Sequence, residues 1–409
     1  IGISSFRQCV GLTGDLNLPD QITTIGKNAF RDCDGFDGKL HLPKNLKTIG
    51  DNAFYMCIKL NGDLIIPESV TSIGSQAFIS CSGFDGHLNI GSSVSYIGYS
   101  SFSGLFNLKG DLIIPDGIEV IKDQTFSNLG CDGKLKLPNT LTSIGSRSFQ
   151  SSNFESNLEL PKEIKSINST SFMNCKFRGE LILPPNLEIL GHRSFYNCPY
   201  FHGSLIIPNK VKLIEFESFS FCFGFNGTLT LPSDTTVIKD GAFNSCFNLK
   251  GSLEIPKSVT RIGYDCFKNC SGFDGHLTLP QTLKSIDNRA FSYCSHLTGD
   301  LILPTELVEL GDRVFLECCG FDGKLSLNCK ITSILKSTFC QCSRLKGDLN
   351  LPDQITKIGE NVFRECLCLD GKLYLPKNLK TIDNNAFSMC SKLNGDLIIP
   401  ESVTSIGSQ

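Results

Sequence analysis

Nearly the same stretch of 24 residues recurs seventeen times along this chain of 409 residues. Gly14 opens the first copy and Gly395 opens the last, and this Gly is replaced only once, by Ser156. A unit this short cannot bury its own apolar face, so each copy has to stack on its neighbours. The sequence therefore predicts a solenoid, with one continuous elongated domain across residues 1–409.

A short strand is expected at the start of each copy. With the Gly counted as position 1, Leu stands at position 3 in every copy and Leu or Ile stands at position 5. Pro follows at position 6 in fifteen copies. This alternation predicts a strand whose Leu points inward and whose end is set by Pro, which has no N–H to donate. Stacking would join these strands into one parallel sheet.

Two later positions also recur, one of them without exception. Position 13 is most often Gly, which predicts a backbone with positive φ there. Position 17 is Phe without exception, counting the partial copy before Gly14, and this predicts a column of stacked rings in the core. The ring positions are Phe6, Phe30, Phe54, Phe78, Phe102, Phe126, Phe149, Phe172, Phe195, Phe219, Phe243, Phe267, Phe291, Phe315, Phe339, Phe363 and Phe387.

The register has one defect. Three consecutive steps between Gly110 and Gly179 are 23 residues long, which predicts a local change in curvature or twist. The chain begins and ends inside a copy, and residues 14–76 read almost as residues 347–409 do. We therefore expect an excerpt of a longer array, without the polar caps that a solenoid needs.

Composition and motifs exclude several classes of protein. The net charge of −3 and the pI of about 6.1 argue against a nucleic-acid partner. No apolar run approaches the ~20 residues of a membrane span, so membrane anchoring is expected only through segments outside this sequence. The six His residues fall at mixed repeat positions, and neither a nucleophile motif nor a phosphate loop occurs. We expect no enzymatic activity, no cofactor and no metal site.

Twenty Cys residues are present, and fourteen of them share position 20 of the repeat. A side chain that recurs once per coil indicates a core ladder, and free Cys packs well as a small buried residue. Free thiols are therefore the favoured interpretation. Disulfides between neighbouring coils stay open as the alternative, whereas zinc is disfavoured because no Cys-x-x-Cys pair occurs.

The outward-facing position 2 alternates in charge, as in Asp15, Lys39 and Asp63. Opposite charges on neighbouring strands would form a stabilising ladder, which is the favoured interpretation. The alternative is a nearly neutral polar face kept for a ligand.

Aromatic residues replace mostly polar ones between residues 182 and 247, which indicates a candidate partner-binding site. Two alternatives are that a flanking loop covers these residues and that repeat copying left them by drift. The candidates are Ile182, Tyr196, Tyr200, Ile206, Phe216, Phe221, Phe223 and Phe247. Three sequons, at Asn168, Asn226 and Asn269, would permit glycan attachment in a secreted chain.

The unit Leu-x-Ile-Pro-x-x-Val-Thr-x-Ile-Gly-x-x-Ala-Phe-x-x-Cys, at Leu64 to Cys81, closely resembles the BspA-like leucine-rich repeat of the Treponema type. The resemblance covers essentially the whole chain. It implies a β-rich solenoid of the α/β type, a right-handed leucine-rich-repeat superhelix of about 17 coils with a parallel β-sheet on its concave face. The strict 24-residue unit is most similar to the protozoan surface-antigen branch.

The same resemblance implies a function. Members are typically surface proteins of oral bacteria and parasitic protozoa, and they adhere to host cells, to other microbes and to matrix proteins such as fibronectin. A cell-surface adhesion protein with protein ligands is thus expected. An intracellular interaction scaffold in the cytoplasm is the alternative, because oxidising compartments rarely leave twenty Cys reduced.

Overall fold

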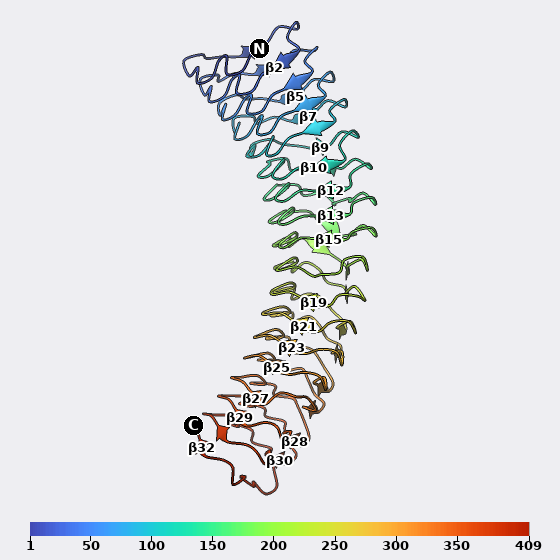
Figure 1. Ribbon diagram of the computed structural model, residues 1–409, viewed down its shortest axis with the longest axis vertical. Helices are drawn as coiled ribbons and strands as arrows, with labels where there is room; N and C mark the ends of the chain where they lie inside the picture. Colours follow the sequence, from blue (N-terminus) through green and yellow to red (C-terminus); the bar gives the residue numbers. More distant parts are fainter. Residues whose placement is uncertain (409) are drawn as a thin grey trace. The chain divides into compact units, whose positions relative to one another are not determined.

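The computed structural model describes residues 1–408 as short parallel strands joined by turns (Figure 1). The chain divides into two compact units, Ile1–Phe201 and His202–Gln409, and coils stack in the same way within each. Parallel stacking of the repeats is confirmed. The α/β label fits only loosely, because no helix occurs among residues 1–408. That one continuous stack runs through the whole chain stays a prediction.

Each coil contributes up to two strands. The first series lies mostly at positions 3 and 4 and is called the Leu row. It comprises β1 (Leu16–Asn17), β3 (Leu40–His41), β5 (Leu64–Ile66), β7 (Leu88–Ile90), β9 (Leu112–Ile113) and β11 (Leu135–Lys136) in the first unit, and β17 (Leu205–Ile206), β18 (Leu229–Thr230), β20 (Leu253–Glu254), β22 (Leu277–Thr278), β24 (Leu301–Ile302), β26 (Leu325–Ser326), β28 (Leu349–Asn350) and β30 (Leu373–Tyr374) in the second. Two further strands, β14 (Gly179–Glu180) and β16 (Phe201–His202), lie in the turns before this row.

The second series lies at positions 11 and 12 and is called the Ile row. In the first unit it comprises β2 (Thr24–Ile25), β4 (Thr48–Ile49), β6 (Ser72–Ile73), β8 (Tyr96–Ile97), β10 (Val120–Ile121), β12 (Ser143–Ile144), β13 (Ser166–Ile167) and β15 (Ile189–Leu190). In the second unit it comprises β19 (Val237–Ile238), β21 (Arg261–Ile262), β23 (Ser285–Ile286), β25 (Glu309–Leu310), β27 (Ser333–Ile334), β29 (Lys357–Ile358), β31 (Thr381–Ile382) and β32 (Ser405–Ile406).

The better-paired row is the one that the sequence did not predict. Strands of the Ile row form four-stranded sheets, whereas those of the Leu row pair only in twos. The expected single sheet of seventeen strands is therefore corrected. Both rows point their apolar residue inward, as the buried Leu64 and Ile73 illustrate.

The predicted Phe column is confirmed within each unit. From Phe6 to Phe195, neighbouring ring centroids lie 5.1 to 5.6 Å apart with planes within 13° of parallel. From Phe219 to Phe387, the centroids lie 5.3 to 5.9 Å apart. The interior rings are fully buried, so each ring meets one ring above and one below.

Positive φ, which was expected at position 13, occurs instead in the turns on either side of each Phe at position 17. Around Phe30, Asn28 has φ 56° and Asp32 has φ 58°. In these turns the N–H of Phe30 donates to the Ala53 carbonyl 2.7 Å away in the next coil. Because such turns are joined through backbone groups, the residues that occupy them vary from coil to coil.

Position 13 is Gly for a different reason. Gly26 and Gly50 do not have positive φ, so that prediction is wrong. A Cβ on Gly50 would instead lie 2.7 Å from the backbone nitrogen of Lys27 in the preceding coil. Gly at this position therefore allows two coils to approach closely.

The coils of the Leu row pair in couples, so the local structural repeat there is two coils. Strand β1 pairs with β3, β5 with β7 and β9 with β11. Within a couple, Asp63 accepts a hydrogen bond of 2.7 Å from the backbone N–H of His87. The N–H of Gly62 donates in the same couple to Asp85, 3.0 Å away.

Glycine geometry follows the same alternation. Gly62 has φ +75°, whereas Gly86 has ordinary φ but an added Cβ would collide with the Asp63 carboxylate. The alternating charges at position 2 are thus explained mainly by backbone hydrogen bonds. One side-chain contact accompanies them, between His87 Nδ1 and Asp63 at 3.3 Å.

The position-20 thiols form the predicted ladder of free cysteines. All twenty Cys are free, and most are buried. Cys81 donates its S–H to the Phe54 carbonyl 2.9 Å away, and Ser152 makes the equivalent bond to Phe126 at 2.8 Å. Burial raises the pKa of Cys198 to about 12, which keeps this thiol protonated at neutral pH.

Candidate partner-binding surfaces

The candidates in the first unit are exposed to different extents. Ile182 is 72% exposed and Tyr200 is 46% exposed, whereas Tyr196 is half-buried. The Arg178 guanidinium lies 4.9 Å from the centre of the Tyr200 ring, and that of Arg193 lies 5.6 Å from the Tyr196 ring. Both rings therefore already have a cationic neighbour.

In the second unit, the structure brings two candidates together. Phe223 and Phe247 share position 21 in successive coils, and their rings stack with centroids 5.3 Å apart. Phe221, at position 19 with φ 61°, is 37% exposed. Phe221 and Phe223 follow the invariant Phe219, and Phe247 follows the invariant Phe243. We call Phe221, Phe223 and Phe247 the Phe223 cluster.

The other two candidates of this unit lie at different positions of the coil. Ile206 is 58% exposed on β17 of the Leu row. Phe216 stands at position 14, with the Lys239 ammonium 5.0 Å from its ring centre. Lys239 also pairs with Glu215 at 2.9 Å, so Phe216 belongs to a polar cluster near the end of the Ile row.

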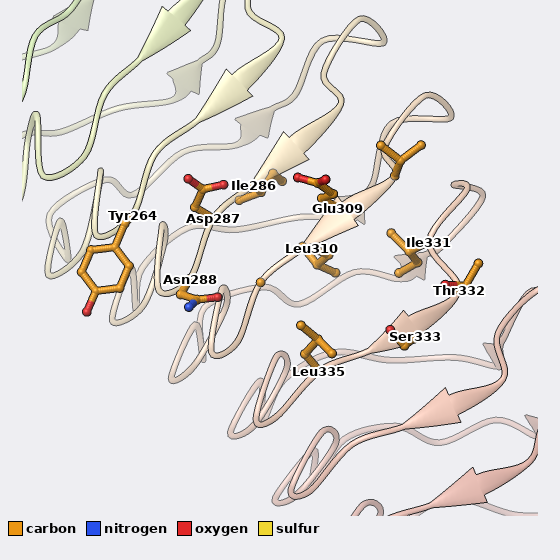
Figure 2. A pocket seen from close by; sticks show the side chains of 12 residues that line it. Tyr264, Ile286, Asp287, Asn288, Glu309, Leu310, Ile331, Thr332, Ser333 and Leu335 are labelled. Carbon is orange, nitrogen blue, oxygen red and sulfur yellow. The ribbon is translucent and has the colours of Figure 1, made fainter.

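A cleft that the sequence did not predict lies in the second unit, where β25 and β27 fail to pair (Figure 2). It has a volume of about 470 Å³. Figure 2 shows Glu309 and Leu310 on one bank and Ile331, Thr332 and Ser333 on the other. The sequence signal was Leu335, which occupies position 13, where Gly is usual.

A larger hollow of about 1140 Å³ lies in the first unit, beside the short coils. Lys134 and Lys136 line one side, and Glu159 and Glu163 line the other. Strand β11 pairs with β9, and no strand forms at residues 158–160. The 23-residue steps thus coincide with an interruption of the Leu row, and the change in curvature or twist expected there stays a prediction.

Sites for chemistry were also sought. Within residues 1–408, no group of three or more His, Cys, Asp or Glu side chains could hold a metal ion. The same residues contain no helix that is long and apolar enough to cross a membrane. Of the sequon residues, Asn226 is exposed, whereas the side-chain amides of Asn168 and Asn269 donate to Ile144 and Ser245, 3.0 and 3.3 Å away.

A parallel solenoid with a Leu row and an Ile row defines a repeat scaffold. The family model of the BspA type leucine-rich repeat region matches residues 1–131, 110–226, 225–345 and 319–409, so the chain belongs to this family. Proteins built from such repeats generally serve to bind other proteins. Comparison with curated proteins gave no match.

Several solved structures are similar to this chain, including that of a leucine-rich repeat protein. One from Bacteroides ovatus ATCC 8483 is 24% identical over 84% of this chain and 82% of its own, with a TM-score of 0.60. The pneumococcal vaccine antigen PcpA is 18% identical over 91% and 89%, with a TM-score of 0.44. A leucine rich cell surface protein from Faecalibacterium prausnitzii A2-165 is 20% identical over 97% and 87%, with a TM-score of 0.37. The first of these supports the fold.

Proposed function

We propose that this protein is a non-enzymatic cell-surface adhesion protein, which binds protein ligands on host cells or in the extracellular matrix, such as fibronectin. The observation that carries the proposal is repetition: each unit presents side chains outward at fixed positions of successive coils. Weak contacts that recur in this way add through avidity. The net charge of −3 favours protein partners over nucleic acid.

Within the second unit, we assign ligand contact to the Phe223 cluster, with Ile206 and Phe216 as further contacts. In the first unit, Ile182, Tyr196 and Tyr200 take the same role. Aromatic side chains give a large contact area with few rotatable bonds, which is why they dominate the energetics of interfaces.

Binding to immobilised fibronectin and to host-cell extract tests this assignment. Replacing Phe221, Phe223 and Phe247 with Ser should weaken binding by about tenfold or more, as expected for hot-spot side chains worth at least about 1.4 kcal/mol together. The matched control replaces Tyr96, Tyr99 and Phe106 with Ser; these are exposed aromatics of the first unit. Unchanged binding of the first variant, with an intact fold, would refute the assignment.

An intracellular scaffold is the second candidate, and the free thiols favour it. Burial weakens this argument, because the pKa of Cys246 and of Cys294 is raised to about 12 and a thiol without thiolate character reacts slowly with oxidants. Labelling intact cells with a membrane-impermeant reagent separates the two functions. Protein that is labelled only after lysis would contradict adhesion.

A further inference from the structure

The cleft between β25 and β27 has a local steric cause. At the preceding junction, the Gly311 N–H donates to the Ile286 carbonyl at 2.9 Å, and a Cβ on Gly311 would lie 2.5 Å from the backbone nitrogen of Asn288. Leu335 stands at this crowded position in the next coil. Its side chain cannot fit against the backbone of the preceding coil, so the two coils separate at this point.

Asp287 and Lys239 replace the same Gly without opening the row, and the Lys239 N–H still donates to the Ile214 carbonyl at 3.0 Å. Asp287 pairs with Arg261 of the preceding coil at 2.5 Å, and β21 still pairs with β23. Lys122 is a further replacement, and its ammonium lies 6.0 Å from the Tyr99 ring centre. There, too, the Ile row is interrupted, between β8 and β10.

The opening leaves backbone groups without partners on both banks. Among residues 1–408, no backbone hydrogen bond joins residues 308–310 to residues 332–335. Bonds resume on either side, from Lys330 N–H to the Leu307 carbonyl at 2.8 Å and from Arg313 N–H to the Lys336 carbonyl at 2.9 Å. The cleft is therefore a short gap between two joined coils, and its unpaired N–H and C=O groups can bond the backbone of a peptide that lies across its mouth.

The cleft is lined by both apolar and polar groups, and its rim is acidic. Val308 is 50% exposed, Tyr264 is 38% exposed and Leu335 is 36% exposed. The lining contains two carboxylates, Asp287 and Glu309, and no Lys, Arg or His. Arg261 pairs with Asp287 and also interacts with Glu309, so these three side chains leave one net negative charge at the rim, and Glu309 is the exposed carboxylate that can meet a ligand.

We propose that this cleft binds an extended peptide segment of a partner protein that carries a basic side chain. The peptide backbone bonds the open strand edges, its apolar side chains contact Val308 and Leu335, and its Lys or Arg pairs with Glu309. This site is separate from the Phe223 cluster, so the proposal stands independently of the adhesion assignment.

The test uses fluorescein-labelled hexapeptides of alternating Val and Thr with one central Lys, Gln or Glu, and fluorescence anisotropy with the full chain. The Lys peptide should bind best and the Glu peptide worst, and added NaCl should narrow the difference. Equal binding of the Lys and Glu peptides, or no saturable binding of the Lys peptide, would overturn the proposal.

Two variants locate the binding. Leu335→Gly should let β25 and β27 pair, as Gly does at other junctions, and should weaken binding of the Lys peptide about tenfold or more. Lys122→Gly is the matched control. It should let β8 and β10 pair in the first unit and should leave the affinity for the Lys peptide within about twofold. Retained affinity in Leu335→Gly would remove this cleft as the site.

Glu309→Lys reverses the rim charge at a position where Lys357 and Arg261 show that a basic residue is tolerated. It should invert the preference between the Lys and Glu peptides without changing the affinity for the Gln peptide. Hydrogen exchange adds an independent readout: the amide of Thr332 should exchange fast in the unmodified chain and slowly when the Lys peptide is bound. Fast exchange in the presence of saturating peptide would contradict bonding of the peptide backbone to this edge.

Discussion

Positions 17 and 13 have opposite packing requirements in each coil. Phe at position 17 fills space, and each ring needs the ring above and below it. Gly at position 13 leaves space, so that backbones can approach to hydrogen-bonding distance. In the coil of Leu335, position 13 is no longer Gly, but the Phe column is intact, because Phe339 still stacks 5.8 Å from Phe315. The core column therefore stays closed where the Ile row opens.

Truncating one ring of the column should be costly. Phe78 is fully buried, with ring centroids 5.1 Å from Phe54 and 5.6 Å from Phe102. Phe78→Ala should lower the free energy of unfolding by about 3–5 kcal/mol, because it leaves a cavity between two rings. Phe106→Ala, at a side chain that is 57% exposed, should cost less than about 0.5 kcal/mol. Urea denaturation compares the two, and equal losses would argue against the column as the core.

The buried thiols predict a loss of stability in alkali. The pKa of Cys198, Cys246 and Cys294 is raised by burial to about 12, from an ordinary value of 9.0. Between these two values the unfolded chain gives up thiol protons that the folded chain keeps. The contribution of these thiols is therefore complete below about pH 9 and is lost as the pH rises toward 12.

Urea midpoints measured at pH 7, 9 and 10.5 check this prediction. A variant with Ser at these three positions should lose less stability over that range, because Ser does not titrate and Ser152 already donates to a carbonyl in the same way. Identical pH profiles for the variant and the parent would contradict it.

Among the elements, the couple of coils is the stable unit of the Leu row. Asp63→Ala should destabilise the chain by about 0.5–1.5 kcal/mol, since it removes the acceptor of the His87 N–H. Asp63→Asn keeps an acceptor and should cost less. The backbone N–H of His87 is the main reason that the pKa of Asp63 is lowered. Its contribution is thus present above the ordinary pKa of a carboxyl and is lost as the pH falls through the lowered value.

Differential scanning calorimetry at pH 7 and pH 3 measures the effect. The gap in melting temperature between the parent and Asp63→Ala should narrow at pH 3. If the difference in melting temperature stays constant, the negative charge of the Asp63 carboxylate does not strengthen its hydrogen bond with the His87 N–H.

For the whole molecule, the alternation limits which coils can be removed. Deleting residues 62–85 removes one coil and leaves the His87 N–H facing Lys39, which cannot accept a hydrogen bond. Deleting residues 62–109 removes a complete couple and keeps the bond of 2.7 Å from the Lys134 N–H to Asp111. Hydrogen exchange should show a fast amide at His87 in the first variant and a protected amide at Lys134 in the second. A protected His87 amide would contradict the two-coil unit.

Much of this architecture could be predicted from the sequence, because Leu, Phe and Cys recur with one residue type at one position. The Ile row was missed because Thr, Ser, Tyr, Val and Glu all precede its Ile or Leu, so the pattern has no clean alternation. The two-coil unit is visible in Asp15 and Lys39, but their charges alone suggest only an ion-pair ladder. The cleft could not be predicted, because Asp287 replaces the same Gly as Leu335 does and yet keeps its sheet closed.

The gaps in the Ile row also bear on mechanical load. When a unit is pulled along its stacking direction, every coil junction carries the same force in series, so the junction with the fewest bonds yields first. In the first unit this is the junction beside Lys122, where neither row is paired, whereas at Leu335 the Leu row still pairs β24 with β26. Under such tension, the first unit would separate at the Lys122 junction and leave its four-stranded sheets intact, so that the junction could close again when the tension is released.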